Sequence, residues 1–242
     1  MTGSADDAAV PRRERVRAST IDEIKATASR LMAESGTVEA RFSDIARAMG
    51  LTAPALYRYF RDRDELLTAL ITDGYDDLAN RLTTAREATA AGDPWGQLLA
   101  VSEAYREWGL EDPSRYALVF GMPVPGFAMP DDATTTLDAR RAMGALVGVL
   151  EDAAQHDLLD PAPVELQSSL LHEHLADKLV DVPVDRHHAA MHVWMSIHGF
   201  VSLEAFGHLS NLPRSGRDEM FAAQVRLNGR VLGLRSASGT SP

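Results

Sequence analysis

The sequence predicts an all-α protein with a small N-terminal domain and a larger C-terminal domain, and three observations lead to this prediction. Apolar residues recur at steps of three and four along most of the 242-residue chain, as they do in amphipathic helices. No segment alternates apolar and polar residues convincingly enough for a β-strand. Glycines and acid–proline pairs interrupt the pattern at intervals that suit short connections between helices.

The N-terminal elements are short and closely spaced. An apolar stripe that begins at Ile21 predicts a first helix, and two short helices follow over 42–49 and 53–60. A long helix begins at Asp62, where Glu65 three residues later completes a capping box. This helix is expected to end near residue 92, at a glycine.

Acid–proline pairs mark the starts of later helices, because Asp93 and Asp112 each precede a proline that fits the first helical turn. The predicted C-terminal helices span 95–110, 114–120, 132–157, 164–180, 185–209 and 216–234. The expected domains are 15–61 and 62–234, with disordered ends over 1–14 and 235–242.

Composition narrows the class of protein. The chain has no cysteine, which excludes disulfides, thiolate metal ligands and thiol nucleophiles and suits a cytoplasmic location. Its first ten residues lack the features of a secretory signal. Residues 1–70 hold 11 Lys+Arg and 11 Asp+Glu, so the whole net charge of −11 belongs to residues 71–242. Either this acidity serves solubility, or it keeps the body away from phosphates, in which case only the N-terminal part suits a DNA duplex.

The segment from Phe42 to Phe60 has the pattern of a helix-turn-helix. Gly50 allows the backbone conformation of a tight turn, Thr52 is expected to cap the second helix, and Pro54 fits its first turn. In this arrangement the second helix enters the major groove of DNA with its N-terminal end first.

At these positions the chain resembles the TetR/AcrR family of bacterial regulators. The matching residues are Ile45-Ala46, Gly50-Leu51-Thr52, Leu56-Tyr57, Tyr59-Phe60 and Arg63-Asp64-Glu65-Leu66-Leu67, within roughly residues 18–68. The resemblance implies a three-helix DNA-binding domain joined to a C-terminal ligand-binding and dimerisation domain. The residues expected to contact double-stranded DNA are Arg41, Ser43, Thr52, Ala53, Pro54, Tyr57, Arg58, Tyr59 and Arg63.

Two of these positions depart from the family pattern. Arg41 stands where the family has a capping Ser or Thr, and it is free to pair with a phosphate; Arg63 replaces the usual Lys. Arg58 is the only long basic residue on the recognition helix, so either it reads guanine through O6 and N7 or it binds a phosphate. The arginines over 12–17 form either a DNA-contacting arm or a solvated tail.

Residues 189–209 are almost free of charge, yet His192, His198, His208 and Glu204 argue against a membrane span. Such a helix is expected to be buried between the body of one chain and a second chain. With the last helix it predicts a four-helix homodimer interface. Its expected residues are Ser202, Ala205, Phe206, Leu209, Phe221, Val225, Asn228 and Leu232.

The C-terminal half also resembles one TetR subgroup that is named for a Trp-His-Gly pattern. The residues that carry this resemblance are Trp194, His198-Gly199, Ser202-Leu203-Glu204, Gly207 and Ser114-Arg115-Tyr116, with the loop over 120–126. The large aromatic and methionine side chains here either line an adaptable apolar cavity or form plain core. The pocket candidates are Trp95, Tyr105, Trp108, Tyr116, Phe120, Met122, Phe127, Met143, Trp194 and His198.

These observations favour a dimeric repressor that a small apolar or aromatic effector releases from a near-palindromic operator. A dimeric DNA binder without a small-molecule effector, or one that responds to a protein, is the alternative. A metal-dependent protein that uses His172, His174, His187, His188 and His192 is a third reading, but their spacing matches no metal motif. No cofactor is expected, and no catalytic grouping is present in the sequence.

Overall fold

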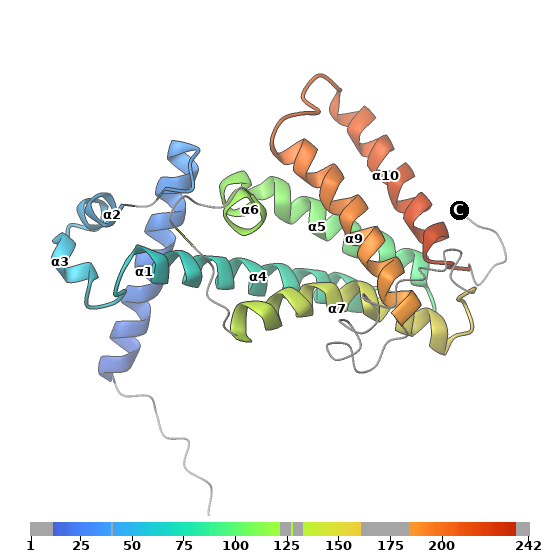
Figure 1. Ribbon diagram of the computed structural model, residues 1–242, viewed down its shortest axis with the longest axis horizontal. Coiled ribbons are helices and arrows are strands. Elements are labelled where there is room, and N and C mark those ends of the chain that lie inside the picture. The colour runs from blue at the N-terminus through green and yellow to red at the C-terminus, as the bar shows by residue number, and fades with distance from the viewer. Residues whose placement is uncertain (1–11, 40, 122–126, 128–132, 161–183, 236–242) are drawn as a thin grey trace, which may run out of the picture.

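The computed structural model describes residues 12–39, 41–121, 127, 133–160 and 184–235, and it confirms the all-α fold. The helices are α1 (Arg12–Ser35), α2 (Phe42–Ala48), α3 (Ala53–Leu56), α4 (Arg63–Glu87), α5 (Pro94–Glu111), α6 (Pro113–Phe120), α7 (Ala133–Gln155), α9 (Val184–Ala205) and α10 (Arg214–Val231). The helix predicted over 164–180 lies outside the described residues. Figure 1 shows α1, α2 and α3 at one end of the molecule and α5, α7, α9 and α10 toward the other, with α4 reaching from the first group to the second.

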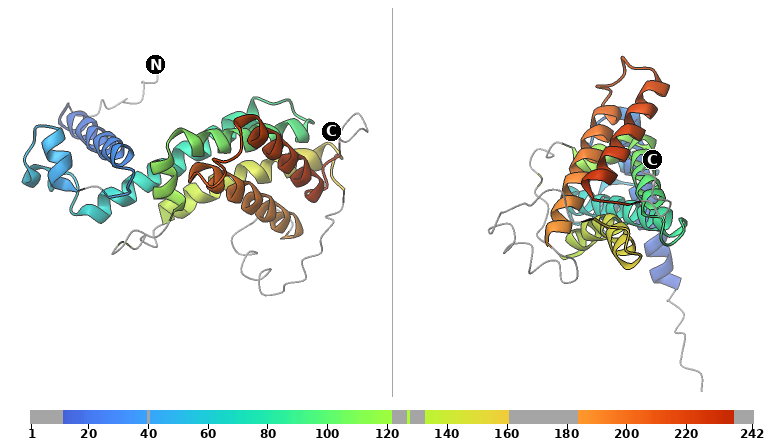
Figure 2. Two further views of the ribbon diagram at one scale, coloured as in Figure 1. Left: turned by 90° about the horizontal axis from the view of Figure 1, so that it is seen from above. Right: turned by 90° about the vertical axis from the view of Figure 1, so that its right-hand side faces the viewer.

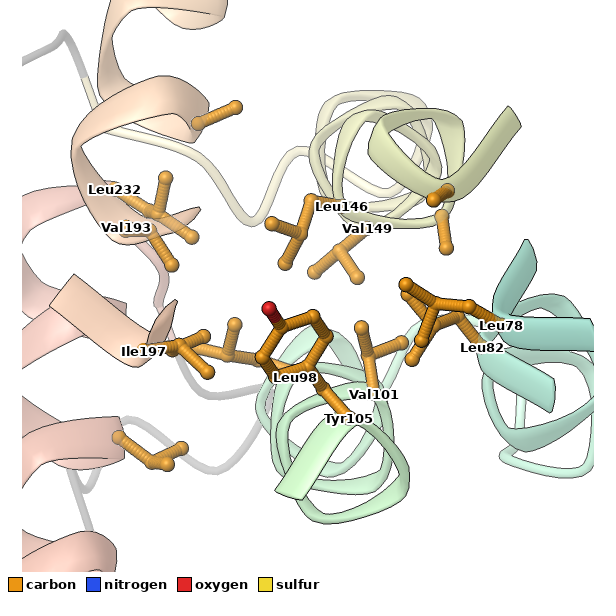
Figure 3. Packing of buried hydrophobic residues seen from close by; sticks show 14 of the residues in the cluster. Leu78, Leu82, Leu98, Val101, Tyr105, Leu146, Val149, Val193, Ile197 and Leu232 are labelled. Carbon is orange, nitrogen blue, oxygen red and sulfur yellow. The ribbon is translucent and has the colours of Figure 1, made fainter. Parts of the chain in front are cut away.

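The long helix α4 runs from one end of the molecule toward the other (Figure 2) and belongs to two hydrophobic cores. Its N-terminal half packs with α1, α2 and α3 through Leu66, Leu67, Leu70 and Ile71. Its C-terminal half belongs to the core of the larger domain, where it packs with residues of α5, α7, α9 and the end of α10 (Figure 3). That core includes Leu78, Leu82, Leu98, Val101, Tyr105, Leu146, Val149, Val193, Ile197 and Leu232.

The capping signals explain where several helices begin. The Asp62 carboxylate accepts a hydrogen bond from the Glu65 backbone N–H at 2.8 Å, and the Glu65 carboxylate in turn accepts one from the backbone N–H of Arg61. Asp93 and Asp112 cap α5 and α6 in the same way. Each cap satisfies backbone donors that have no partner within the helix.

Several helix ends differ from the sequence-based limits. α1 begins at Arg12, inside the segment expected to be disordered. α3 ends at Leu56 rather than at residue 60, because the chain continues there in short turns. α4 ends at Glu87, and Gly92 lies in the following turn with φ +77°. α9 ends at Ala205, two residues before Gly207, whose φ of +78° breaks the helix.

Two glycines in helices provide a matched test of how closely the C-terminal helices pack. A Cβ on Gly109 of α5 would lie 2.6 Å from Cγ1 of Val201 on α9, whereas a Cβ on Gly144 of α7 would meet nothing within 4 Å. We expect Gly109→Ala to lower the free energy of unfolding by about 1–3 kcal/mol through overpacking. We expect Gly144→Ala to raise it by about 0.5–1 kcal/mol, because alanine favours the helix. Urea unfolding of both variants checks the pair, and equal stabilisation by both would contradict the close approach of α5 and α9.

Candidate functional site

The two short helices α2 and α3 are held at a fixed angle by a tight turn and a small core. Gly50 has φ +67°, and the backbone N–H of Leu51 donates to the carbonyl oxygen of Ala46 at 2.8 Å. Ile45, Ala46 and Leu56 are buried between the helices and α1. These residues hold α3 in place and leave Pro54 exposed and Ala53 and Ala55 half-buried.

The N-terminal end of α3 is polar and open. Thr52 occupies the N-cap position in extended backbone, but its hydroxyl makes no capping hydrogen bond, contrary to the sequence-based expectation. Pro54 lies in the first turn and is exposed, and Ala53 is half-buried. The exposed hydroxyl of Thr52 is therefore available to an external acceptor such as a phosphate, whereas Pro54 has no N–H and the N–H of Ala55 already donates to the Thr52 carbonyl oxygen.

The residues after α3 form the rest of this surface. Tyr57 is 58% exposed, although its ring also contacts Phe42 with centroids 5.0 Å apart. Arg58 is exposed and has no carboxylate partner in the described part of the chain. Tyr59 is half-buried, beneath the guanidinium of Arg17 at 5.5 Å from the ring centroid.

Three further DNA-contact candidates surround α3. Ser43 on α2 is exposed, and Arg63 is the first residue of α4. Arg41 holds the N-cap position of α2 without capping it; its side chain is 75% exposed and lies 3.9 Å from the Glu39 carboxylate. The predicted DNA-contact residues thus lie on α2, α3 and the start of α4, which meet at one end of the molecule (Figure 1).

In the larger domain, six of the predicted pocket residues lie in one group, here called the aromatic cluster: Tyr105, Trp108, Tyr116, Phe120, Trp194 and His198. They come from α5, α6 and α9. The imidazole of His198 is central, stacked on Trp194 with centroids 4.8 Å apart and edge-on to Phe120 at 5.1 Å. The rings of this cluster contact one another directly.

A small set of polar groups lies inside the aromatic cluster. Nδ1 of His198 is 2.8 Å from the Tyr105 hydroxyl and 3.1 Å from the Tyr116 hydroxyl. The Tyr116 hydroxyl is also 2.7 Å from Oγ of Ser202. Burial lowers the pKa of His198 and raises the pKa values of Tyr105 and Tyr116. All three rings are therefore neutral near pH 7, and they offer hydrogen bonds inside an apolar wall.

The other pocket candidates lie elsewhere. The ring of Trp95 packs against α10, where it would lie 2.2 Å from a Cβ on Gly229. Phe127 packs against the N-terminal core rather than against the aromatic cluster. Met143 packs at the edge of the core of the larger domain, and Met122 lies outside the described residues.

The sequence did not single out the polar contacts that attach the aromatic cluster to α4. The indole N–H of Trp108 donates to the Asp77 carboxylate at 2.9 Å, and the guanidinium of Arg115 donates to the same carboxylate at 3.0 Å. Arg115 also lies over the Trp108 ring, 4.7 Å from its centroid. These contacts, here called the Asp77 junction, join α4, α5 and α6 at one carboxylate.

The predicted dimer residues fall into two groups. Phe221, Val225, Asn228 and Leu232 are buried in the core of their own chain, so the stripe of α10 expected to face a partner packs inward instead. A buried carboxylate helps to hold α10 there: Glu204 of α9 accepts two hydrogen bonds from Arg106 of α5, and it lies 3.2 Å from Arg217 of α10.

Several apolar side chains of α9, of α10 and of the segment after α9 are exposed instead. Phe206 is 45% exposed, and Ser202, Ala205 and Leu209 are partly exposed. The exposed residues that the sequence pattern did not indicate are Met195 and Leu203 on α9 and Met220 and Leu227 on α10. Met220 and Leu227 are two helical turns apart, so they share one face of α10.

The histidine-rich and apolar segments raise the question of a metal site and of a membrane span. Among the described residues, no three His, Asp or Glu side chains gather as metal ligands would. His172 and His174 lie outside this part of the chain, and His188 is buried. No helix of the described ranges is both long and apolar enough to cross a membrane.

Comparisons with known proteins cover both domains. A family model described as "Bacterial regulatory proteins, tetR family" matches residues 24–70, and one described as "Tetracyclin repressor-like, C-terminal domain" matches residues 98–227. The HTH-type transcriptional regulator Rv1816 of Mycobacterium tuberculosis is 32% identical over 210 residues, which cover 84% of this chain and 88% of the relative.

Solved structures agree with this assignment. The crystal structure of the regulatory protein SCO4313 has a TM-score of 0.72 and 33% identity, and the match covers 90% of this chain and 98% of that one. RolR, solved in complex with resorcinol, has a TM-score of 0.53 and 17% identity over 94% of each chain, which indicates a shared fold. The chain therefore belongs to the TetR family of bacterial transcription regulators.

Proposed function

We propose that the protein is a homodimeric repressor that leaves a near-palindromic operator when a small, largely apolar effector binds in the larger domain. The observation that carries this proposal is the surface of α3 and its flanks. There, Thr52, Tyr57 and Arg58 are exposed and positioned by a buried core behind them. In a helix-turn-helix, side chains so placed reach the base edges and phosphates of a major groove.

Dimerisation supplies the spacing between two such surfaces. α9 and α10 both expose large apolar side chains, and such side chains, where they form a patch, mark association surfaces in many proteins. Two copies of this helix pair would form a four-helix interface. A dimer of this kind places its recognition helices about one helical turn of DNA apart, roughly 34–36 Å.

The aromatic cluster is the proposed effector site. Its wall of large rings suits an apolar or aromatic molecule, and the hydroxyls of Tyr105 and Tyr116 with the imidazole of His198 suit one polar substituent. This arrangement also agrees with the Trp-His-Gly subgroup resemblance, which includes Trp194 and His198. A protein of this kind acts in the cytoplasm, where its operator lies.

A change in the aromatic cluster has a short route to the DNA-binding domain. α6 places Tyr116 in the aromatic cluster and Leu118 in the N-terminal core, and the hydroxyl of Ser114 lies 3.5 Å from the Met32 carbonyl oxygen of α1. The Asp77 junction ties α6 to α4 at the same level. A coupling of about 1–3 kcal/mol through these helices changes DNA affinity about 5–150-fold.

A second candidate function is a dimeric DNA binder without a small-molecule effector. It is favoured by the direct ring-to-ring contacts of the aromatic cluster, which an effector would have to displace. A thermal-shift screen with small aromatic compounds separates the two functions. A compound that raises the melting temperature and weakens DNA binding supports the repressor with an effector, and the absence of any such compound supports the second function.

The DNA-binding surface is tested first with gel shifts on DNA from the protein's own promoter. Arg58→Ala is expected to weaken binding by about 1–3 kcal/mol for each guanine that the arginine reads, and to relax base preference at one position of each half-site. Arg30→Ala, at an exposed arginine in the C-terminal half of α1, is the control and keeps parental binding. A loss for Arg58→Ala that is the same on operator and random DNA would instead place Arg58 on a phosphate.

The dimer surface is tested with charge insertion. We expect Leu203→Arg and Leu227→Arg to give folded monomers, because each puts a charge into an apolar interface. Leu99→Arg is the matched control and stays dimeric, since Leu99 is 40% exposed on α5 and lines a groove with Phe221 and Ala222 of α10 rather than with Leu203 or Leu227. Light scattering after size-exclusion chromatography measures the mass, and dimeric Leu203→Arg and Leu227→Arg proteins would rule out this interface.

The buried imidazole predicts a pH dependence of stability. The pKa of His198 is lowered in the folded state, so below the ordinary histidine range of about 6.5 the unfolded state binds more protons. Stability is therefore complete above that range and falls as the pH drops through it. In His198→Asn we expect a smaller loss in the urea midpoint between about pH 7.5 and 5.5 than in the parent. An equal loss in both proteins would show that other groups cause the acid sensitivity.

A further inference from the structure

The first two turns of α1 bury no side chain in the hydrophobic core. Residues 12–19 are all exposed, and the first buried residue of the helix is Ile24. The family model of the DNA-binding domain matches from residue 24 onward, so these turns lie outside that match. In Figure 1 this end of α1 extends beyond α3 and α4 into solvent. Burial therefore does not account for the choice of residues over 12–19.

These turns carry a strong local charge. Arg12, Arg13, Arg15 and Arg17 stand among six residues with a single acid, Glu14, whereas residues 71–242 carry the whole net negative charge. Within the described part of the chain, Arg12, Arg13 and Arg15 have no ion-pair partner. No carboxylate of the described residues therefore neutralises their positive charge, which lies in the N-terminal domain.

Arg17 fixes which side of the helix faces the recognition surface. Its guanidinium donates to the carbonyl oxygen of Arg58 at 2.9 Å and lies over the Tyr59 ring. One side of α1 is thus held directly against the chain that follows α3. The contact joins residues 41 positions apart, so the periodicity of the sequence could not reveal it.

Helix geometry places Arg13 and Arg15 on different sides of α1. Successive residues turn by about 100°, so Arg13 lies one turn before Arg17 and only about 40° from it around the axis. Arg15 points about 160° away from Arg17, on the opposite side. Arg13 therefore continues the side of α1 that faces α3, about 6 Å farther along the axis.

The helical form also decides which part of DNA these arginines contact. An α-helix with its side chains is roughly 10–12 Å wide, and the minor groove is only about 6 Å wide. A flexible arm can lie in that groove, but this helix cannot. Phosphates along the rim of the groove that α3 enters are the acceptors within reach.

We propose that the first two turns of α1 form an extension that binds phosphates of the DNA backbone beside the recognition helix. Arg13 is its main contact, and Arg17 orients the helix. The proposal rests on the proposed DNA-binding function. It adds a sequence-independent contact that raises affinity for any duplex and leaves the choice of operator to α3.

The test compares Arg13→Ala with Arg15→Ala, which removes the same charge from the opposite side of the same helix. The probes are the operator selected from random DNA by the parent protein and a scrambled duplex of equal length. Dissociation constants are measured by fluorescence anisotropy over a series of salt concentrations. Both variants remain folded, because neither side chain is buried.

For Arg13→Ala we expect affinity to fall by the same factor on both probes. The slope of log affinity against log salt becomes shallower by about 0.9 for each phosphate that the protein no longer neutralises, or about 1.8 for a dimer. Arg15→Ala changes the slope much less. An unchanged slope for Arg13→Ala, or equal changes for both variants, would overturn the positioned contact. A parent protein that binds operator and scrambled DNA without salt dependence would instead contradict the proposed DNA-binding function itself.

Discussion

The structure depends on the continuity of α4, a single helix that belongs to two cores. Leu66, Leu67 and Leu70 fix its first half among the DNA-reading helices, and Leu78 and Leu82 fix its second half in the larger domain. The helix has no break between them, so the two domains are joined through packed side chains rather than by a flexible linker. A movement of the larger domain therefore reaches the DNA-reading helices as a movement of α4.

The short helix α6 makes this connection sensitive to the aromatic cluster. Tyr116 of α6 is buried in the core of the larger domain, and Leu118, two residues later, is buried in the N-terminal core. Gly74 marks the close approach of α4 to α6, because a Cβ there would lie 2.7 Å from Val119. Close packing of this kind transmits displacement, since the interior has no space to absorb it. Effector binding and DNA binding would then compete through the same few contacts.

Local signals allowed much of the fold to be predicted from the sequence. The aspartates at positions 62, 93 and 112 cap helices because capping depends on neighbouring residues alone. The turn at Gly50 followed from the backbone conformation that glycine permits. Six of the ten pocket candidates contact one another, but the sequence indicated neither this selection nor the polar contacts among them, and their role as a pocket stays a prediction. Non-local packing explains the rest. An apolar stripe indicates which side of a helix is buried but not which element packs against it. The stripe of α10 that includes Phe221 and Val225 was therefore assigned to a dimer partner, whereas it packs in the core of its own chain. The same ambiguity placed Phe127 in the wrong core. The contact of Arg17 with the chain after α3 joins distant positions, so the arginines before it had no predictable orientation.

Two copies of α3, held by one dimer, are expected to occupy successive major grooves on one side of the duplex, and the proposed function depends on this placement. Chemical footprinting with dimethyl sulfate tests it most directly, because the reagent methylates guanine N7 in the major groove and adenine N3 in the minor groove. The expected result is protection of guanine N7 in two segments about one helical turn apart, with adenine N3 left reactive. Protection of a single segment, or of adenine N3 in place of guanine N7, would contradict this placement.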